Sequence, residues 1–519
     1  MRSISPSEVR LRFIARAEIA LLDLREESVF ASAHPLFASQ LSFDRIETEI
    51  LDRIPRKSTH IVLYDDDNGL VEPAAAKLAA LGYDMIDSLA GGLNGWRDAG
   101  YELFQDVNSY SKAFGELVEV ERKTPSLTAE RVHSLIHEGA DIAILDARRF
   151  DEYNVMSIPQ GVSTPGAELV LRAQNVAPDP ATTIIVNCAG RTRSIIGTQS
   201  LVNAGLPNPI YALRNGTIGW TLAGQALDTG QTRSAPMPEE RALAEAQDRA
   251  RAVAYRAGVK RLRLSEVEML EQQRDRTLYR LDVRTPDEYR QGHICGFRNA
   301  PGGQLVQETD MVAPVRGARI VLADDLFVRA DMSASWLAQM GWEVYVLEDG
   351  FEGALESGDW QPTLPVLPPV EWISQAELGE ALDREEIALF DLGTSKEHRL
   401  GHLPGARFVM RKELGHWLAR MADNASAVLL SRDGAHAAFA AADNPQRVRV
   451  LTGGTQGWKE QGLPVEKGFD DALSEPVDTY KRPYEGTGNS RDAMQSYLDW
   501  EYGLVAQLEK DGTHGFTVI

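Results

Sequence analysis

Hydrophobic and polar positions along the chain follow one pattern four times. Each copy opens with a strand-like residue and a helix N-cap, and later reaches an apolar strand that ends in aspartate. The caps and aspartates pair as Ser5 with Asp23, Thr128 with Asp146, Ser265 with Asp282, and Ser374 with Asp391. Their offsets are 18, 18, 17 and 17 residues, so the four copies share one register. The three serine caps have glutamate three residues later, which predicts capping boxes; the second copy has Arg131 there.

A second apolar strand follows in each copy. It is predicted over residues 61–64, 184–187, 320–323 and 428–430. The next residue is Asp65, Cys188, Asp324 or Ser431, which lies 42, 42, 42 and 40 residues after the first aspartate. A helical stretch, another strand and a glycine-rich turn complete each copy, and Gly82, Gly205 and Gly341 are predicted helix C-caps. Strands that alternate with short helices predict an α/β fold, in which helices flank both faces of a central parallel sheet.

The pattern predicts four tandem domains, at residues 1–106, 122–230, 261–362 and 370–468. Residues 231–260 include a stretch rich in Ala, Glu and Arg, which predicts one exposed helix that acts as a spacer. The proline-rich segment 362–369 predicts a stiff extended linker. The C-terminal tail, residues 469–519, contains aromatic residues and a helical stretch near 491–509, and we expect it to pack on a domain.

Composition narrows the class of protein. Of the 519 residues, 43% are hydrophobic and 25% are charged, which is typical of a globular chain. The net charge of −22 has the opposite sign to that of a nucleic-acid binder. No apolar run reaches membrane-spanning length, and residues 1–16 have no continuous apolar region of the kind found in secretory signals. We therefore expect a cytoplasmic protein with neither a nucleic-acid nor a membrane partner.

The chain has only two cysteines, Cys188 and Cys295. This number excludes a disulfide framework and a cysteine-rich metal site. Cys295 follows Gly292-His293-Ile294 and is interpreted as a small, partly buried residue, because no metal-ligand partner lies nearby in sequence. No metal site is expected.

Several of these motifs resemble the rhodanese family of sulfurtransferases. The shared marks are the opening cap, an Asp-x-Arg after the first strand, a Gly-His-Ile/Leu turn and a Gly-Gly-x-x-Gly-Trp turn. Here they read Asp146-Ala147-Arg148 and Asp282-Val283-Arg284, Gly292-His293-Ile294 and Gly401-His402-Leu403, and the turns 91–96, 216–220 and 453–458. The second copy has Met156-Ser157-Ile158-Pro159 in place of the Gly-His turn, and the third has Ala354 in place of the turn tryptophan. The resemblance covers about four-fifths of the chain and implies four tandem rhodanese-like domains.

The second copy carries the candidate reaction centre. Residues 187–194 read Asn-Cys-Ala-Gly-Arg-Thr-Arg-Ser, with Cys188 at the end of a buried strand and a helix shortly after it. Such a loop turns backbone N–H groups inward, and the helix N-terminus adds positive charge. Both effects predict a lowered pKa for Cys188 and a reactive thiolate. The candidate catalytic residue is Cys188, and the candidate substrate-binding residues are Ala189, Gly190, Arg191, Thr192 and Arg193.

Arg148 is a weaker candidate, because it would equally serve to order the first loop or to pair with a carboxylate. The resemblance implies that Cys188 takes sulfur from a small anionic donor such as thiosulfate, becomes a persulfide, and passes the sulfur to cyanide or a thiol. The loop N–H groups would stabilise the developing charge, and neither a metal nor an organic cofactor is implied. The loop does not separate thiosulfate from 3-mercaptopyruvate, and the physiological donor, the acceptor and any protein partner stay open.

Two alternatives are weighed against this reading. The first alternative is phosphatase activity, because the cell-cycle dual-specificity phosphatases have a similar fold. Their loop from Cys to Arg is one residue longer, whereas four residues separate Cys188 from Arg193 here, which favours sulfur transfer. Asp65, Asp324 and Ser431 stand at the cysteine position of the other copies, so domains 1, 3 and 4 are predicted to be inactive; the two carboxylates would repel an anion. The second alternative is therefore a non-catalytic persulfide carrier or scaffold built from rhodanese modules.

Overall fold

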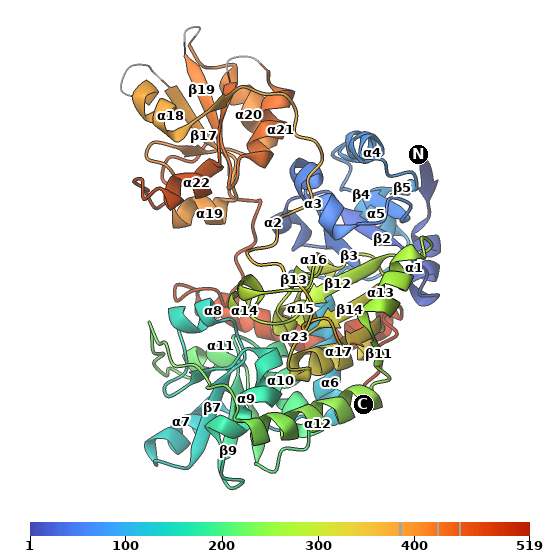
Figure 1. Ribbon diagram of the computed structural model, residues 1–519, viewed down its shortest axis with the longest axis vertical. Helices are drawn as coiled ribbons and strands as arrows, with labels where there is room; N and C mark the ends of the chain where they lie inside the picture. Colours follow the sequence, from blue (N-terminus) through green and yellow to red (C-terminus); the bar gives the residue numbers. More distant parts are fainter. Residues whose placement is uncertain (383–386, 423–424, 446–447) are drawn as a thin grey trace.

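The computed structural model describes residues 1–382, 387–422, 425–445 and 448–519 (Figure 1). The eight remaining residues belong to the expected domain 370–468 and lie outside the described residues. Each of the four copies forms a five-stranded sheet in which every paired strand is parallel. The strand orders are β1-β5-β4-β2-β3, β6-β10-β9-β7-β8, β11-β15-β14-β12-β13 and β16-β20-β19-β17-β18. With their flanking helices, the four sheets confirm the predicted α/β fold.

The first two domains have closely similar element orders. Domain 1 comprises β1 (Arg2–Ile4), α1 (Pro6–Ile14), β2 (Ala20–Asp23), α2 (Glu27–Phe30), β3 (Ala38–Gln40), the 3-10 helix η1 (Phe43–Arg45), α3 (Ile46–Arg53), β4 (Ile61–Tyr64), α4 (Val71–Ala80), β5 (Ile86–Leu89) and α5 (Gly92–Asp98). Domain 2 comprises β6 (Ser126–Leu127), α7 (Ala129–His137), β7 (Ile142–Asp146), α8 (Phe150–Val155), β8 (Val162–Ser163), the 3-10 helix η2 (Gly166–Glu168), α9 (Leu169–Val176), β9 (Thr183–Asn187), α10 (Thr192–Asn203), β10 (Ile210–Leu213) and α11 (Gly216–Leu222).

The last two domains repeat this order, except that the described part of domain 3 lacks the helix that follows the last strand in the other domains. Domain 3 comprises β11 (Lys260–Leu262), α13 (Leu264–Gln272), β12 (Leu278–Asp282), α14 (Pro286–Gln291), β13 (Arg298–Asn299), α15 (Gly302–Gln307), α16 (Thr309–Val312), β14 (Arg319–Ala323), α17 (Val328–Gln339) and β15 (Glu343–Leu347). Domain 4 comprises β16 (Trp372–Ile373), α18 (Gln375–Leu382), β17 (Ile387–Asp391), α19 (Ser395–Leu400), β18 (Arg407–Phe408), α20 (Arg411–Leu418), β19 (Ser426–Leu430), α21 (Ala435–Asp443), β20 (Val448–Leu451) and α22 (Gly454–Glu460). Within the described part of domain 3, no helix follows β15 at the turn that lacks tryptophan.

Three of the four predicted helix caps are found where the sequence places them. Ser5 and Ser374 form capping boxes with Glu8 and Glu377, and Thr128 caps α7 without a box. The cap predicted at Ser265 is wrong, because α13 already begins at Leu264. The backbone N–H of Arg263 donates to Glu266 at 2.8 Å, so the box lies two residues earlier.

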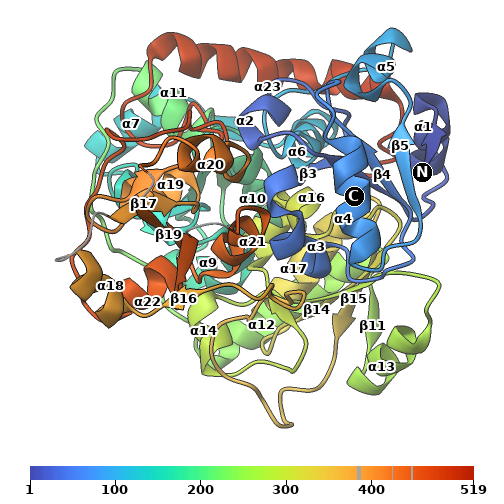
Figure 2. The same cartoon turned by 90° about the horizontal axis from the view of Figure 1, so that it is seen from above.

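Among the described residues, three helices belong to none of the four repeated domains: α6 (Ser109–Arg122), α12 (Glu240–Arg256) and α23 (Arg491–Asp511). Sequence analysis left α6 unassigned, because residues 107–121 fall between two expected domains. The helix α12 was expected to be exposed, but Ala246, Ala250 and Val253 bury one of its faces in the core of domain 2. Helix α23 runs from α11 of domain 2 to α5 of domain 1 (Figure 2).

The first three domains are joined by shared apolar cores. One core runs through domains 1 and 3 and includes α6 and, from α23, Leu504 and Leu508. The core of domain 2 takes in Val328 and Met332 from α17 of domain 3. Domain 4 has separate cores made from its own residues and the segments that flank it, and it lies at one end of the molecule (Figure 1). In the described part of the chain, no helix has the length and apolar character needed to cross a bilayer.

Domain 4 docks on domain 1 largely through polar contacts around Arg411. Its guanidinium donates to the backbone oxygen of Asp44 at 3.0 Å and to Glu47 at 3.1 Å. We expect Arg411→Ala to weaken docking by about 2 kcal/mol, because it leaves Glu47 without this charge partner. Limited proteolysis should then cut the 362–369 linker faster than in the wild type. Arg407→Ala, which removes an exposed arginine of the same domain, is the control; equal cleavage of both variants would contradict the expectation.

Candidate active site around Cys188

The loop that carries Cys188 is held from one side by helix α11. Strand β9 ends at Asn187 and α10 begins at Thr192. The N–H groups of Thr217 and Ile218 donate to the carbonyls of Cys188 and Ala189, at 2.9 and 3.0 Å. Gly216 makes this approach possible, because a Cβ there would lie 2.3 Å from the Cys188 carbonyl oxygen. Since a trans peptide points its N–H away from its carbonyl, the N–H groups of Ala189 and Gly190 face the opposite side.

The corresponding loops of domains 1 and 3 show what these N–H groups bind. The Asp65 carboxylate accepts from the N–H groups two and five residues later, those of Asp67 (3.0 Å) and Leu70 (2.8 Å). The Asp324 carboxylate accepts from the N–H groups two, five and six residues later, at 3.2, 2.8 and 3.2 Å. In both domains the aspartate side chain therefore fills the anion-binding nest of its own loop.

The same positions in domain 2 are Gly190, Arg193 and Ser194. In domain 4, Ser431 uses the position six residues later, because its Oγ accepts from the N–H of Ala437 at 3.2 Å. The Gly190 N–H has no hydrogen-bond acceptor among the described residues. The loop of domain 2 thus leaves the Gly190 N–H open to an anion, while Ser194 already donates to the Cys188 sulfur.

The Cys188 side chain is enclosed. The residue is 2% exposed, and burial raises the pKa of its thiol. The positive charge of Arg193 and hydrogen bonds from Ser194 lower this pKa, but by less than burial raises it. The sequence-based expectation of a lowered pKa is therefore wrong for the closed site, because the strand-end pattern did not show what covers the loop.

Arg193 lies beside the loop in a buried ion pair. Its Nη1 and Nη2 donate to Glu152 of α8 at 2.6 and 2.9 Å. Burial raises the pKa of Glu152, but the charge and hydrogen bonds of Arg193, together with the charges of Arg148 and Arg149, outweigh it and lower that pKa to about 2. Arg329 and Glu288 form the same pair in domain 3, at 2.7 Å. Arg193 is thus held in place while its charge still acts on Cys188.

Arg191 points away from the centre of the loop. Its Nε and Nη2 donate to Glu116 of α6 at 2.8 Å each, and Nη2 also donates to Glu119. The guanidinium lies 4.0 Å from the ring centroid of Tyr502 on α23. Sequence analysis expected Arg191 to hold an anion, whereas here it ties the loop to α6.

The remaining candidates have structural contacts. Arg148 donates to Asp146 at 2.9 and 2.7 Å and to the Met156 carbonyl at 2.6 Å, which is the ordering role weighed for it. Ala189 packs in an apolar cluster with Tyr484 and Tyr497. Thr192 lines a separate cavity, and its hydroxyl has no partner among the described atoms.

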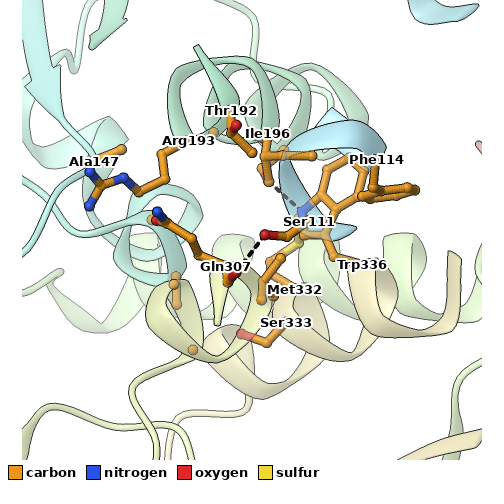
Figure 3. A pocket seen from close by; sticks show the side chains of 17 residues that line it. Ser111, Phe114, Ala147, Thr192, Arg193, Ile196, Gln307, Met332, Ser333 and Trp336 are labelled. Atoms are coloured by element: carbon orange, nitrogen blue, oxygen red, sulfur yellow. Dashed lines mark hydrogen bonds between the residues drawn. The ribbon is translucent and has the colours of Figure 1, made fainter. Parts of the chain in front are cut away.

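That cavity has a volume of about 40 Å³ and lies beside the first turn of α10 (Figure 3). Side chains from α6, α10, α15 and α17 meet around it, among them Phe114, Arg193, Gln307 and Trp336. Cys188 does not line it. The thiol is therefore not reached through this cavity, which belongs to the junction of domains 2 and 3.

A roof from outside domain 2 covers the loop; it consists of α6 and of the tail residues Tyr484, Tyr497 and Glu501. Tyr484 and Tyr497 are buried, and α23 packs on both α6 and α11. Lys112 of α6 is buried against Asp106 at 2.8 Å and lies over both tyrosine rings. Sequence analysis expected the tail to pack on a domain because of its aromatic residues, but did not place it over the Cys188 loop and left α6 unassigned.

Comparisons with known proteins agree with this architecture. The family model for the rhodanese-like domain matches residues 5–99, 128–223, 266–357 and 374–461. These ranges cover well over half of the chain, so the chain belongs to the rhodanese family, as the sequence motifs indicated.

A crystal structure of a thiosulfate sulfurtransferase from Pseudomonas aeruginosa is 54% identical, with a TM-score of 0.96 and 100% of both chains covered. A rhodanese-related protein from Thermoplasma volcanium is 22% identical, with a TM-score of 0.17, and the match covers 19% of this chain and 99% of that one. An HTH-type transcriptional regulator of Mycobacterium tuberculosis is 32% identical over 106 residues. That match covers 19% of this chain and 46% of the regulator, so this chain spans less than half of the regulator's length.

The position of Arg193 gives a test of the electrostatics. Arg193→Ala should raise the pKa of Cys188, because the guanidinium charge is what lowers it against burial. The rate of alkylation by iodoacetamide, followed residue by residue by mass spectrometry, should then rise with pH at a higher pH than in the wild type. Cys295, which was expected to be partly buried but is exposed, is the internal reference, and Arg131→Ala, on the exposed surface of α7, is the control. An unchanged pH profile for Cys188 in Arg193→Ala would refute this role.

Proposed function

We propose that this chain is a thiosulfate-using sulfurtransferase with a single reaction centre at Cys188. The observation that carries the proposal is the Cys188 loop, whose N–H positions bind a carboxylate in the sister loops of domains 1 and 3. Cys188 puts a sulfur nucleophile where Asp65 and Asp324 put a carboxylate. The full-length similarity to the Pseudomonas aeruginosa thiosulfate sulfurtransferase supports the same chemistry.

The proposed reaction is a double displacement. The Cys188 thiolate attacks the outer sulfur of thiosulfate, the S–S bond of the donor breaks, and sulfite leaves with the bonding electron pair. The terminal sulfur of the resulting persulfide carries a negative charge, which the N–H groups of Gly190, Arg193 and Ser194 stabilise. Cyanide or a thiolate then attacks that terminal sulfur, the bond to Sγ breaks, and the Cys188 thiolate is restored.

Access to Cys188 requires movement. At 2% exposure the residue offers almost no surface to a donor, so part of the roof must be displaced before attack. The roof in return keeps water away from the persulfide, and a water-poor site strengthens the interaction of the charged sulfur with the loop. We further propose a cytoplasmic location, where a reducing environment keeps Cys188 and Cys295, both free here, as thiols.

A second candidate function is that of a persulfide carrier or scaffold. Its support is the closed state of the site, in which burial raises the pKa of Cys188 and both loop arginines are paired with carboxylates. A carrier would hold the persulfide stably and release it to a partner. An enzyme would turn over rapidly with small donors and acceptors.

The deciding measurement is thiocyanate formation from thiosulfate and cyanide, with 3-mercaptopyruvate as a parallel donor. We expect Cys188→Ser to reduce the rate to that without protein, because the only sulfur nucleophile placed in a nest is removed. Cys295→Ser, which removes an exposed thiol, should keep the wild-type rate. Turnover retained in Cys188→Ser would overturn the proposal. A persulfide that forms on wild-type Cys188 without turnover would favour the carrier.

A further inference from the structure

Glu501 of α23 brings a carboxyl group over the Cys188 loop. The residue is 1% exposed. Its Oε1 accepts a hydrogen bond from the Tyr497 hydroxyl at 2.9 Å, while Oε2 has no partner among the described residues. Oε2 faces the loop, because a Cβ at Gly190 would lie 3.2 Å from it. A buried carboxyl oxygen without a hydrogen bond is costly, so its position calls for a physical reason.

The neighbour of Oε2 is part of the anion nest. The positions equivalent to Gly190 are Asp67 and Leu326, whose N–H groups donate to the carboxylates that occupy the sister loops. Oε2 therefore lies at the rim of the place where an oxygen of an anionic donor would bind. A carboxylate there would repel the donor, since both charges would be buried, whereas a carboxylic acid would donate a hydrogen bond to it.

The surroundings of Glu501 favour the acid. Burial, followed by the negative charge of Glu116, raises the pKa of Glu501 to about 8. Opposing effects come from Lys112, from the Tyr497 hydroxyl and from Arg191. The titratable groups that face Glu501 are Lys112 and Glu116 on α6, Arg191 and Cys188 on the loop, and Tyr497 on its own helix. At neutral pH Glu501 therefore carries a proton.

We propose that Glu501 is a donor-binding residue of the Cys188 site, which recognises the anionic sulfur donor through the O–H of its protonated carboxyl, beside the Gly190 N–H. This inference rests on the proposed function, because it names a residue that selects the substrate of that site. No bond is formed or broken at Glu501: its proton stays on the carboxyl and is shared with an oxygen of the donor. The tail thereby supplies a recognition group that domain 2 does not contain.

The sign of the pH dependence follows from this role. An anion that binds only to the acid form must take up one proton when Glu501 is ionised. Binding should be constant well below pH 8 and should weaken by up to about tenfold for each pH unit above it. The rate of sulfur transfer also depends on ionisation of the Cys188 thiol and would rise as more thiolate forms, so binding is measured separately from turnover.

The test is calorimetric titration of thiosulfate into the full-length Cys188→Ser protein, in which no sulfur transfer occurs, across the pH range on both sides of pH 8. Measurements in two buffers of different ionisation enthalpy report the proton uptake. The expected result is weaker binding above pH 8 together with uptake of about one proton. Adding Glu501→Gln, whose amide stays neutral and keeps an N–H donor, should leave binding within a few-fold of its neutral-pH value and remove both effects. Adding Glu509→Gln instead, at an exposed position of the same helix, should leave both effects in place.

Three outcomes would overturn the inference: the same pH dependence with Glu501→Gln, no proton uptake with Glu501 present, or no thiosulfate binding at any pH. The first two need no assumption about turnover. The proposed function is judged separately, by thiocyanate formation in proteins that keep Cys188. If the protein turns over but the pH dependence of thiosulfate binding is the same with Glu501→Gln, only this inference is overturned. If no Cys188-dependent thiocyanate formation is found, the proposed function is overturned.

Discussion

The site depends on two hydrogen bonds that α11 makes to the Cys188 loop. The N–H groups of Thr217 and Ile218 hold the carbonyls of Cys188 and Ala189, and planar trans peptides then turn the next N–H groups to the other side. An anion nest follows from this constraint without any charged side chain. Asp65 and Asp324 show that the nest forms around a negative charge, because each carboxylate fills its own loop. At the same position domain 2 has a sulfur atom in place of the carboxylate, and the proposed chemistry depends on this one difference.

Domain 2 is joined to the other domains by the groups that cover its Cys188 loop. The ion pair between Arg191 and Glu116 fixes the loop to α6, and α6 shares its core with domains 1 and 3. From α23, Leu504 enters that core, while Tyr497 and Glu501 reach the loop. Domains 1 and 3 therefore do not need chemistry of their own to affect Cys188. They form the frame on which its roof is fixed.

Local signals in the sequence predicted most of the fold. The repeated caps, the strands that end in aspartate and the glycine turns each depend on residues close together in the chain. Each sheet has the four expected strands and a fifth, short edge strand (β3, β8, β13 or β18) that the sequence analysis did not predict. The cap at Ser265 failed because a second glutamate, Glu266, two residues before Glu268, fits the true box. Cys188 and its loop were predicted as the candidate site for the same local reason. The partner of Arg191, the cover of the thiol and the place of Glu501 were not, because they depend on contacts between residues far apart in the chain.

The raised pKa of the thiol and the proposed chemistry are compatible once the nest is considered. In the closed structure Cys188 carries an uncharged thiol, and burial disfavours its ionisation. The persulfide has its charge one atom further out, on the sulfur that reaches the N–H groups. The loop therefore stabilises the sulfur-loaded state more than the resting thiolate. The thiol must lose its proton to solvent before it can attack, so the raised pKa slows the first step. Once the sulfur has been transferred, the proposed persulfide gains loop contacts that the resting thiol lacks.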